Sequence, residues 1–111
     1  MAIKLIDYTG NLSRGMILRC RGKVPYEKIV DFMIVESGRA TSPSYSLMVS
    51  SGYKAGLVYS VLPDESIPSE DDGYAVNLSW LKMNWGKWGY FECPLNEVYV
   101  LENQPPESMP N

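Results

Sequence analysis

The segment from Ser44 to Leu62 constrains the fold most, because it reads as two short strands joined by a glycine-containing turn. The strands are Tyr45–Val49 and Leu57–Val61, in which apolar side chains recur at every second position, the period of a β-strand. Gly52 and Gly56 between them supply the positive φ angles that a longer hairpin turn needs. We predict an antiparallel hairpin with two shared faces, formed by Tyr45, Leu47 and Val49 and by Leu57, Tyr59 and Val61.

A second segment, residues 77–90, carries all three tryptophans at helical spacing. Its pattern residues stand at i, i+3, i+7 and i+10 and are Leu78, Leu81, Trp85 and Trp88. Asn77 or Ser79 is suited to cap the start of this helix, and we expect Gly86 to limit its length. A domain this small needs bulky residues in its interior. We therefore assign a core role to Trp80, Leu81, Trp85 and Trp88.

The remaining segments add strands on both sides of these two. Ala2–Tyr8, Gly15–Gly22 and Val98–Leu101 read as strands, whereas Ser37–Pro43 reads as a loop. Tyr26–Glu36 fits either a helix or a strand, and its β-branched residues favour a strand that is apolar on both faces. The fold class that follows is α+β, an antiparallel sheet of five to seven strands, open or curled toward a half-barrel, with one short Trp-rich helix packed on it.

Length and charge point to one acidic domain. A chain of 111 residues is one domain on length priors, which we place at residues 1–103, followed by a flexible tail at 104–111. The net charge of −3 is unevenly distributed. Residues 1–63 hold eight Lys and Arg against four Asp and Glu, and residues 64–111 hold two against nine. The acidic second half repels phosphates and suits a basic partner.

The sequence has few of the residue types and motifs that catalysis or metal binding needs. The chain has no histidine, which is the commonest general base and metal ligand. Cys20 and Cys93 match no metal or redox spacing, and two buried free thiols are favoured over a disulfide. Gly10 and Gly15 lack the Lys-Ser/Thr of a phosphate-binding loop. We predict no catalytic residues, no metal and no cofactor. With no signal peptide or long apolar run, we expect a cytoplasmic protein without membrane contact.

Recognition of a partner is the function class that remains. Eight tyrosines is a high count, and aromatic residues with a polar tip are enriched at interfaces. Tyr53 lies at the predicted hairpin tip and Tyr74 beside an acidic loop. The candidate contact residues are therefore Asp64, Glu65, Glu70, Asp71, Asp72, Tyr53 and Tyr74. A hard-cation site in the loop is less favoured, because its spacing matches no calcium loop.

A second class of function stays open at this point. Gly15–Gly22 alternates so that Arg19 and Arg21 share one face with Ile17, opposite Met16, Leu18 and Cys20. Together with exposed tyrosines, that basic face would suit a small RNA- or nucleotide-binding β module. Strong retention on a phosphate or heparin column at low salt would favour this nucleic-acid-binding hypothesis over a protein-binding function.

Roughly half of the chain resembles a known family. The residues that carry the resemblance are the turn from Gly52 to Gly56, Leu62-Pro63 with the acids that follow, and Trp80-Leu81 followed by Asn84-Trp85 and Trp88. This order is similar to that in bacterial polymorphic-toxin immunity proteins of the immunity protein 45 family, with Val98–Glu102 as the closing strand.

The resemblance implies a small cytoplasmic protein that binds and silences a toxin in the cell that makes it. The toxin would be secreted or delivered by contact-dependent growth inhibition, and nucleases such as tRNases are frequent among such toxins. The partner would then be a basic toxin domain, with no direct contact to nucleic acid. The resemblance carries no catalytic residue to this chain.

Overall fold

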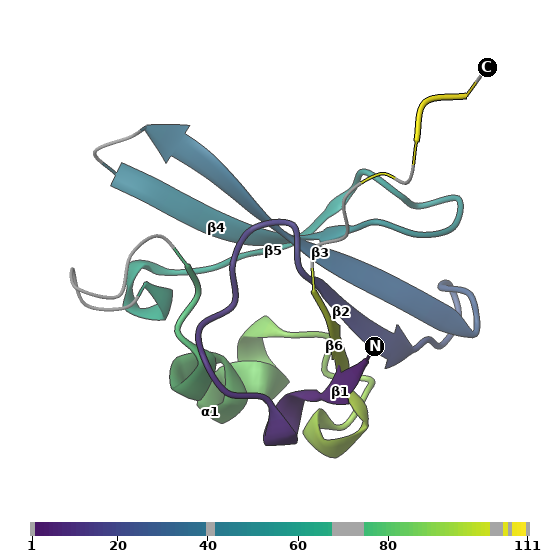
Figure 1. Cartoon of the computed structure of the whole chain (residues 1–111). Coiled ribbons are helices and arrows are strands. Elements are labelled where there is room, and N and C mark those ends of the chain that lie inside the picture. The colour runs from purple at the N-terminus through teal and green to yellow at the C-terminus, as the bar shows by residue number, and fades with distance from the viewer. Residues whose placement is uncertain (1, 40–41, 68–74, 103–105, 107, 111) are drawn as a thin grey trace.

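The structure is a computed structural model. Its described residues form an open antiparallel sheet with one α-helix, which is drawn below the sheet in Figure 1. The structure describes residues 2–39, 42–67, 75–102, 106 and 108–110. Within these residues, the strands are β1 (Ile3–Lys4), β2 (Ile17–Arg21), β3 (Ile29–Arg39), β4 (Ser42–Val49), β5 (Val58–Val61) and β6 (Tyr99–Leu101). The helical elements are α1 (Leu78–Trp88) and the 3₁₀ turns η1 (Leu5–Asp7), η2 (Asp64–Ser66) and η4 (Leu95–Glu97). The predicted α+β class is confirmed.

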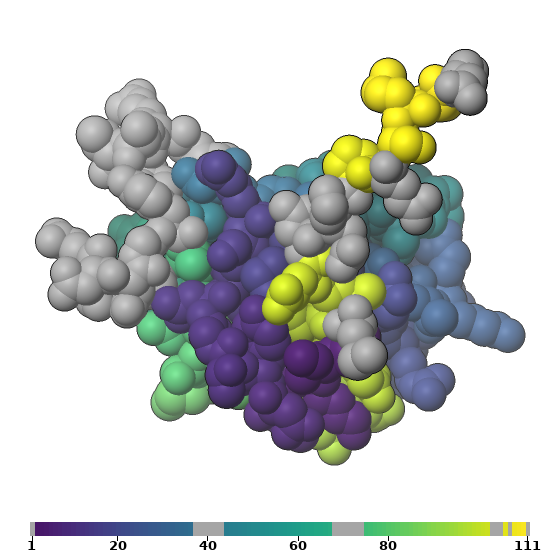
Figure 2. All heavy atoms as spheres, viewed as in Figure 1, coloured from purple at the N-terminus to yellow at the C-terminus, as the bar shows by residue number. Residues whose placement is uncertain are grey.

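The order of the strands is β1-β6-β2-β3-β4-β5, so β1 and β5 are the two edges of the described sheet. All the pairings are antiparallel. The C-terminal strand β6 lies between the two N-terminal strands β1 and β2 and pairs with both. Figure 2 shows this from the same viewpoint, with yellow-green atoms beside the purple N-terminal segment. The two ends of the domain are therefore held together by the sheet.

Strand β3 settles the ambiguity of Tyr26–Glu36 in favour of a strand. It runs to Arg39, and β4 begins at Ser42, so the predicted loop over Ser37–Pro43 is wrong at residues 37–39 and 42–43. Residues 40–41 lie outside the described residues. The two strands pair along this segment, with Ser37 opposite Ser44 and Arg39 opposite Ser42. Cross-strand pairing thus extends the strands through residues whose local preference favours a turn.

The hairpin of β4 and β5 is confirmed, but one of its predicted faces is wrong. Gly52 and Gly56 have φ of 71° and 100°, as the turn requires. Leu47 pairs with Ser60 whereas Met48 pairs with Val58, so Tyr59 is an extra residue in a β-bulge. Tyr59 consequently packs against the core while Val61 is exposed, and the two do not share a face.

Helix α1 starts where the sequence predicts and ends later. The Asn77 side chain accepts a hydrogen bond of 2.8 Å from the Trp80 backbone N–H and caps the N-terminus. Gly86 does not end the helix; it lies inside it, and Gly89 follows the last helical residue. A side chain at Gly89 would collide with the Trp85 ring, so close packing there requires glycine. The first predicted strand is likewise shorter than Ala2–Tyr8, because η1 begins at Leu5.

The core lies between one face of the sheet and α1. Leu81 and Trp85 of α1 are buried, whereas Trp80 and Trp88 are partly buried and pack against the core cluster. The Trp85 indole N–H donates a buried hydrogen bond of 2.8 Å to the Cys93 carbonyl. Alternate strand residues complete the core: Leu18, Cys20, Val30, Phe32, Ile34, Tyr45, Leu47, Val49 and Val100. No helix in the described residues is long and apolar enough to cross a membrane.

Candidate protein-binding surface

Three of the predicted contact residues are described, and they lie at opposite ends of one hairpin. Tyr53 is at the β4–β5 turn, whereas Asp64 and Glu65 form the exposed start of η2, just past the other end of β5 (Figure 1). The predicted contacts Glu70, Asp71, Asp72 and Tyr74 lie outside the described residues. The structure thus separates Tyr53 from the described acids, and a partner that touches both would have to span the hairpin.

Tyr53 is exposed yet held in one orientation. Its side chain is 74% exposed, while its hydroxyl donates a hydrogen bond of 3.1 Å to the Pro25 carbonyl. Its backbone N–H donates to the Glu27 carboxylate at 3.2 Å. Lys54 lies 5.3 Å from the centre of the Tyr53 ring, a cation–π distance. These contacts join the β2–β3 loop to the β4–β5 turn and orient the Tyr53 ring.

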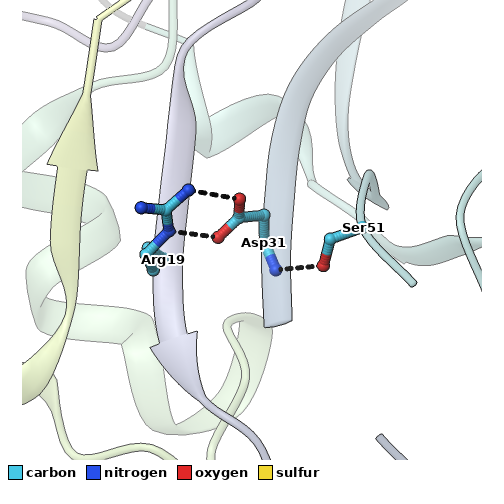
Figure 3. A network of polar contacts seen from close by, with 3 residues as sticks. All are labelled: Arg19, Asp31 and Ser51. Carbon is cyan, nitrogen blue, oxygen red and sulfur yellow. Dashed lines mark hydrogen bonds and ion pairs between the residues drawn. The ribbon is translucent and has the colours of Figure 1, made fainter. Parts of the chain in front are cut away.

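The face of the sheet opposite the core carries a row of polar side chains. The strand register places Lys4, Tyr99, Arg19 and Asp31 side by side across β1, β6, β2 and β3. Arg19 and Asp31 form a bidentate ion pair, with Nε–Oδ1 and Nη2–Oδ2 distances of 2.8 and 2.9 Å. Figure 3 shows this pair and a third contact, in which the Asp31 backbone N–H donates to the Ser51 hydroxyl at 2.9 Å. The hydrogen bonds to Asp31 raise the pKa of Arg19 above its ordinary value.

Next to this row the sheet surface is hollowed. The hollow has a volume of about 350 Å³, and its lining includes Lys4, Arg19, Arg21, Ile29, Glu97 and Tyr99. Arg21 and Glu97 approach to 3.7 Å and both are largely exposed, so their attraction is weak. Sequence reasoning found Arg19 and Arg21 through strand alternation. It missed Lys4, Glu97 and Tyr99, because only the insertion of β6 between β1 and β2 brings them there.

The two cysteines, 73 positions apart in the sequence, interact in the core. Both are free and buried, as expected. Burial, and then the neighbouring Cys93 thiol, raise the pKa of the Cys20 thiol far above its ordinary value. Such a thiol stays protonated and is a poor nucleophile or metal ligand at neutral pH. Among the residues described, no group of three or more His, Cys, Asp or Glu side chains could hold a metal ion.

These features define a small α+β domain whose surface offers aromatic and arginine side chains, residue types that are enriched at protein interfaces. Comparison with protein families agrees with the resemblance seen in the sequence. The model of the family "Immunity protein 45" matches residues 5–100, and the chain belongs to that family. Neither the search of curated proteins nor that of solved structures gave a match.

Proposed function

We propose that this protein neutralises a cognate bacterial toxin by binding its toxic domain in a stoichiometric complex. The observation that carries the proposal is the family match over residues 5–100, which runs from η1 into β6 and includes α1. Immunity proteins act on a toxin that the producing cell must survive. The protein would therefore work in the cytoplasm of that cell, against a toxin that is secreted or delivered by contact-dependent growth inhibition.

Charge supports a basic toxin domain, such as a nuclease that cleaves tRNA. Residues 64–111 hold nine acidic and two basic side chains. Asp64 and Glu65 are exposed on η2 and form no ion pair with another described residue. Nucleases bind phosphates through basic surfaces, and an acidic inhibitor is attracted to such a surface over about 10 Å at 0.1 M salt. We propose Asp64 to Asp72 as the segment that guides the approach of the toxin.

Binding, rather than catalysis, is the mechanism we propose. The chain has no histidine, and burial keeps the Cys20 thiol protonated by raising its pKa. Inhibition by a stable complex needs no reactive group, and a specific protein pair typically buries about 1,600 Å² in total. One escaped toxin molecule is harmful, so we expect a nanomolar or lower dissociation constant.

The structure gives the RNA-binding alternative less support than the sequence does. Its basic strand face depends on Arg19 and Arg21. Arg19 forms a bidentate ion pair with Asp31, and Arg21 lies near Glu97. Since two carboxylates offset these two guanidinium groups, only the charge of Lys4 remains in excess on this face, which is little for a phosphate backbone that carries a charge on every nucleotide. We therefore propose no nucleic-acid partner.

Affinity purification from the native bacterium tests the proposed function. The tagged protein is used as bait, and bound proteins are identified by mass spectrometry and titrated against the bait by calorimetry. We expect a near-stoichiometric partner encoded by the neighbouring gene, with a toxic C-terminal domain. Co-expression of the immunity protein should restore growth of cells that produce this domain. A lack of any specific partner, in a strain shown to express the neighbouring gene, would contradict the proposal.

A further inference from the structure

Strand β3 is apolar on both faces, but the described elements bury only one of them. On the inner face, Val30, Phe32 and Ile34 are fully buried in the core. On the outer face, Met33 is only partly buried and Ile29 is 59% exposed. A strand that is apolar on both sides is typical of a sheet covered on both sides. The outer face of this sheet therefore has the composition of a contact surface.

The register extends this apolar surface across the sheet. Leu101 pairs with Ile17, Ile17 with Met33, Met33 with Met48, and Met48 with Val58. Directly opposite residues in antiparallel strands have side chains on the same face. The outer apolar row, which we define as Leu101, Ile17, Met33, Met48 and Val58, thus crosses five strands from β6 to β5. Its last member, Val58, is 57% exposed.

The outer apolar row is bordered by the polar row of Lys4, Tyr99, Arg19 and Asp31. Arg19 is neutralised by Asp31, and the Arg19–Asp31–Ser51 contacts hold this border in place before binding (Figure 3). A preordered border lowers the entropy cost of association. Methionine, tyrosine and arginine, which interfaces favour, are all present here.

The hollow beside the polar row favours a negatively charged group of the partner. Its cations are Lys4, Arg19 and Arg21, and the nearby carboxylates are Glu97 and Asp31, which leaves one positive charge in excess. Lys4 forms no ion pair with any residue that the structure describes. A carboxylate placed between Lys4 and Arg21 would balance this excess.

We propose that the outer face of the sheet is the buried centre of the toxin interface. An apolar patch of the toxin covers the outer apolar row, and an acidic side chain of the toxin enters the hollow beside Lys4 and Arg21. This inference rests on the proposed function and adds the surface and the chemistry of the partner. The acidic segment on η2 then accelerates the encounter, while the sheet face supplies the lasting contact.

Substitutions on the two faces of the molecule test this surface, with the purified toxin domain as the probe. Met33→Lys and Val58→Lys place a charge on the outer apolar row. Met83→Lys makes the same change as Met33→Lys on the exposed side of α1, where Met83 is 85% exposed. We expect the first two to weaken binding about 100-fold, the loss typical of a central contact, and the third to change it less than about twofold. Val58→Lys keeps the test valid if Met33→Lys does not fold, which thermal denaturation will show.

The charge preference is tested by Lys4→Glu with Arg21→Glu, matched by Lys87→Glu on α1. We expect the double variant to bind about tenfold more weakly and the control to bind normally. If the wild-type protein binds the toxin, and both Val58→Lys and the Lys4/Arg21 double variant bind it with the same affinity, this inference is overturned. The proposed function would then remain intact. A homodimer that forms through this face and persists with toxin bound would also overturn it. If the wild-type protein binds no toxin, both proposals fail.

Discussion

The Tyr53 hydroxyl donates a hydrogen bond to the Pro25 carbonyl, 3.1 Å away, and so ties the tip of the β4–β5 turn to the β2–β3 loop. This contact orients an exposed aromatic ring without burying it. A ring that is already fixed loses little side-chain entropy when a partner covers it. Tyr53 is therefore suited to anchor a protein contact, as the sequence suggested on grounds of position alone.

Replacing Tyr53 should separate the role of its ring from that of its hydroxyl. We expect Tyr53→Ala to weaken toxin binding at least about tenfold, which is about 1.4 kcal/mol. Tyr53→Phe should lose less, since the ring remains and only the bond to Pro25 is removed. Phe91→Ala, at another exposed aromatic residue, is the matched control. Equal binding of wild-type protein and Tyr53→Ala in a calorimetric titration would remove Tyr53 from the interface.

Reversing the charge of η2 should act on the rate of association. We expect Asp64→Lys with Glu65→Lys to slow association and flatten its dependence on salt, because exposed charges act mainly by steering the encounter. The dissociation rate should change little. Stopped-flow measurements between about 0.05 and 0.5 M salt make this comparison, spanning Debye lengths from above 10 Å to below it. An unchanged association rate at low salt would show that η2 does not guide the toxin.

Two glycines near the end of α1 should respond to alanine in opposite directions. Gly86 is inside the helix with no heavy atom near an added Cβ, so Gly86→Ala should raise the free energy of unfolding by about 1 kcal/mol. At Gly89 an added Cβ would collide with the Trp85 ring, so Gly89→Ala should lower it by about 1–3 kcal/mol. Urea denaturation measures both, and each variant is the control for the other. Stabilisation by Gly89→Ala would contradict this packing.

The Cys20 thiol should make the protein less stable in alkaline solution. Burial raises its pKa in the folded state above the ordinary value of 9.0. Between these two pKa values the unfolded chain releases the proton and the folded chain keeps it, so the unfolded state binds fewer protons. The free energy of unfolding must then fall as the pH rises above about 9.

Denaturation at several pH values tests this linkage. The decline above pH 9 should be shallower in Cys20→Ala than in the wild-type protein. Some decline should remain, because burial also raises the pKa of Tyr59 and of Tyr90 above 10.0. Identical slopes for the two proteins would show that Cys20 makes no contribution. In the folded protein we also expect neither buried thiol to react with a disulfide reagent at neutral pH.

Local patterns were sufficient for several elements. The two glycines of the β4–β5 turn have the positive φ that the hairpin prediction required. Asn77 caps α1 because a short side-chain acceptor stands directly before a helical apolar stripe. The alternation of β2 correctly separated buried Leu18 and Cys20 from exposed Arg19 and Arg21. Each of these features depends on residues only a few positions apart.

Elsewhere, cross-strand pairing overrode local preference. Ser37–Pro43 has the composition of a loop, yet the pairing of β3 with β4 extends both strands through most of it. A single bulged residue, Tyr59, shifts the register of β5, so that Tyr59 and Val61 lie on opposite faces of the sheet. No pattern in the sequence predicts this bulge. The helix continues past Gly86 to Trp88, and Gly89, which follows it, lies against the Trp85 ring.

The class of the fold, the hairpin, the helix and the family can therefore be predicted from the amino-acid sequence. These follow from periodicity, capping and motif order, which are local properties of the chain. The order of the strands in the sheet, and with it the set of side chains that form each surface, is known only from the folded structure. Lys4, Arg19 and Tyr99 meet because β6 enters between β1 and β2. That placement is set by the burial of the whole core, to which residues from Leu5 to Val100 contribute together.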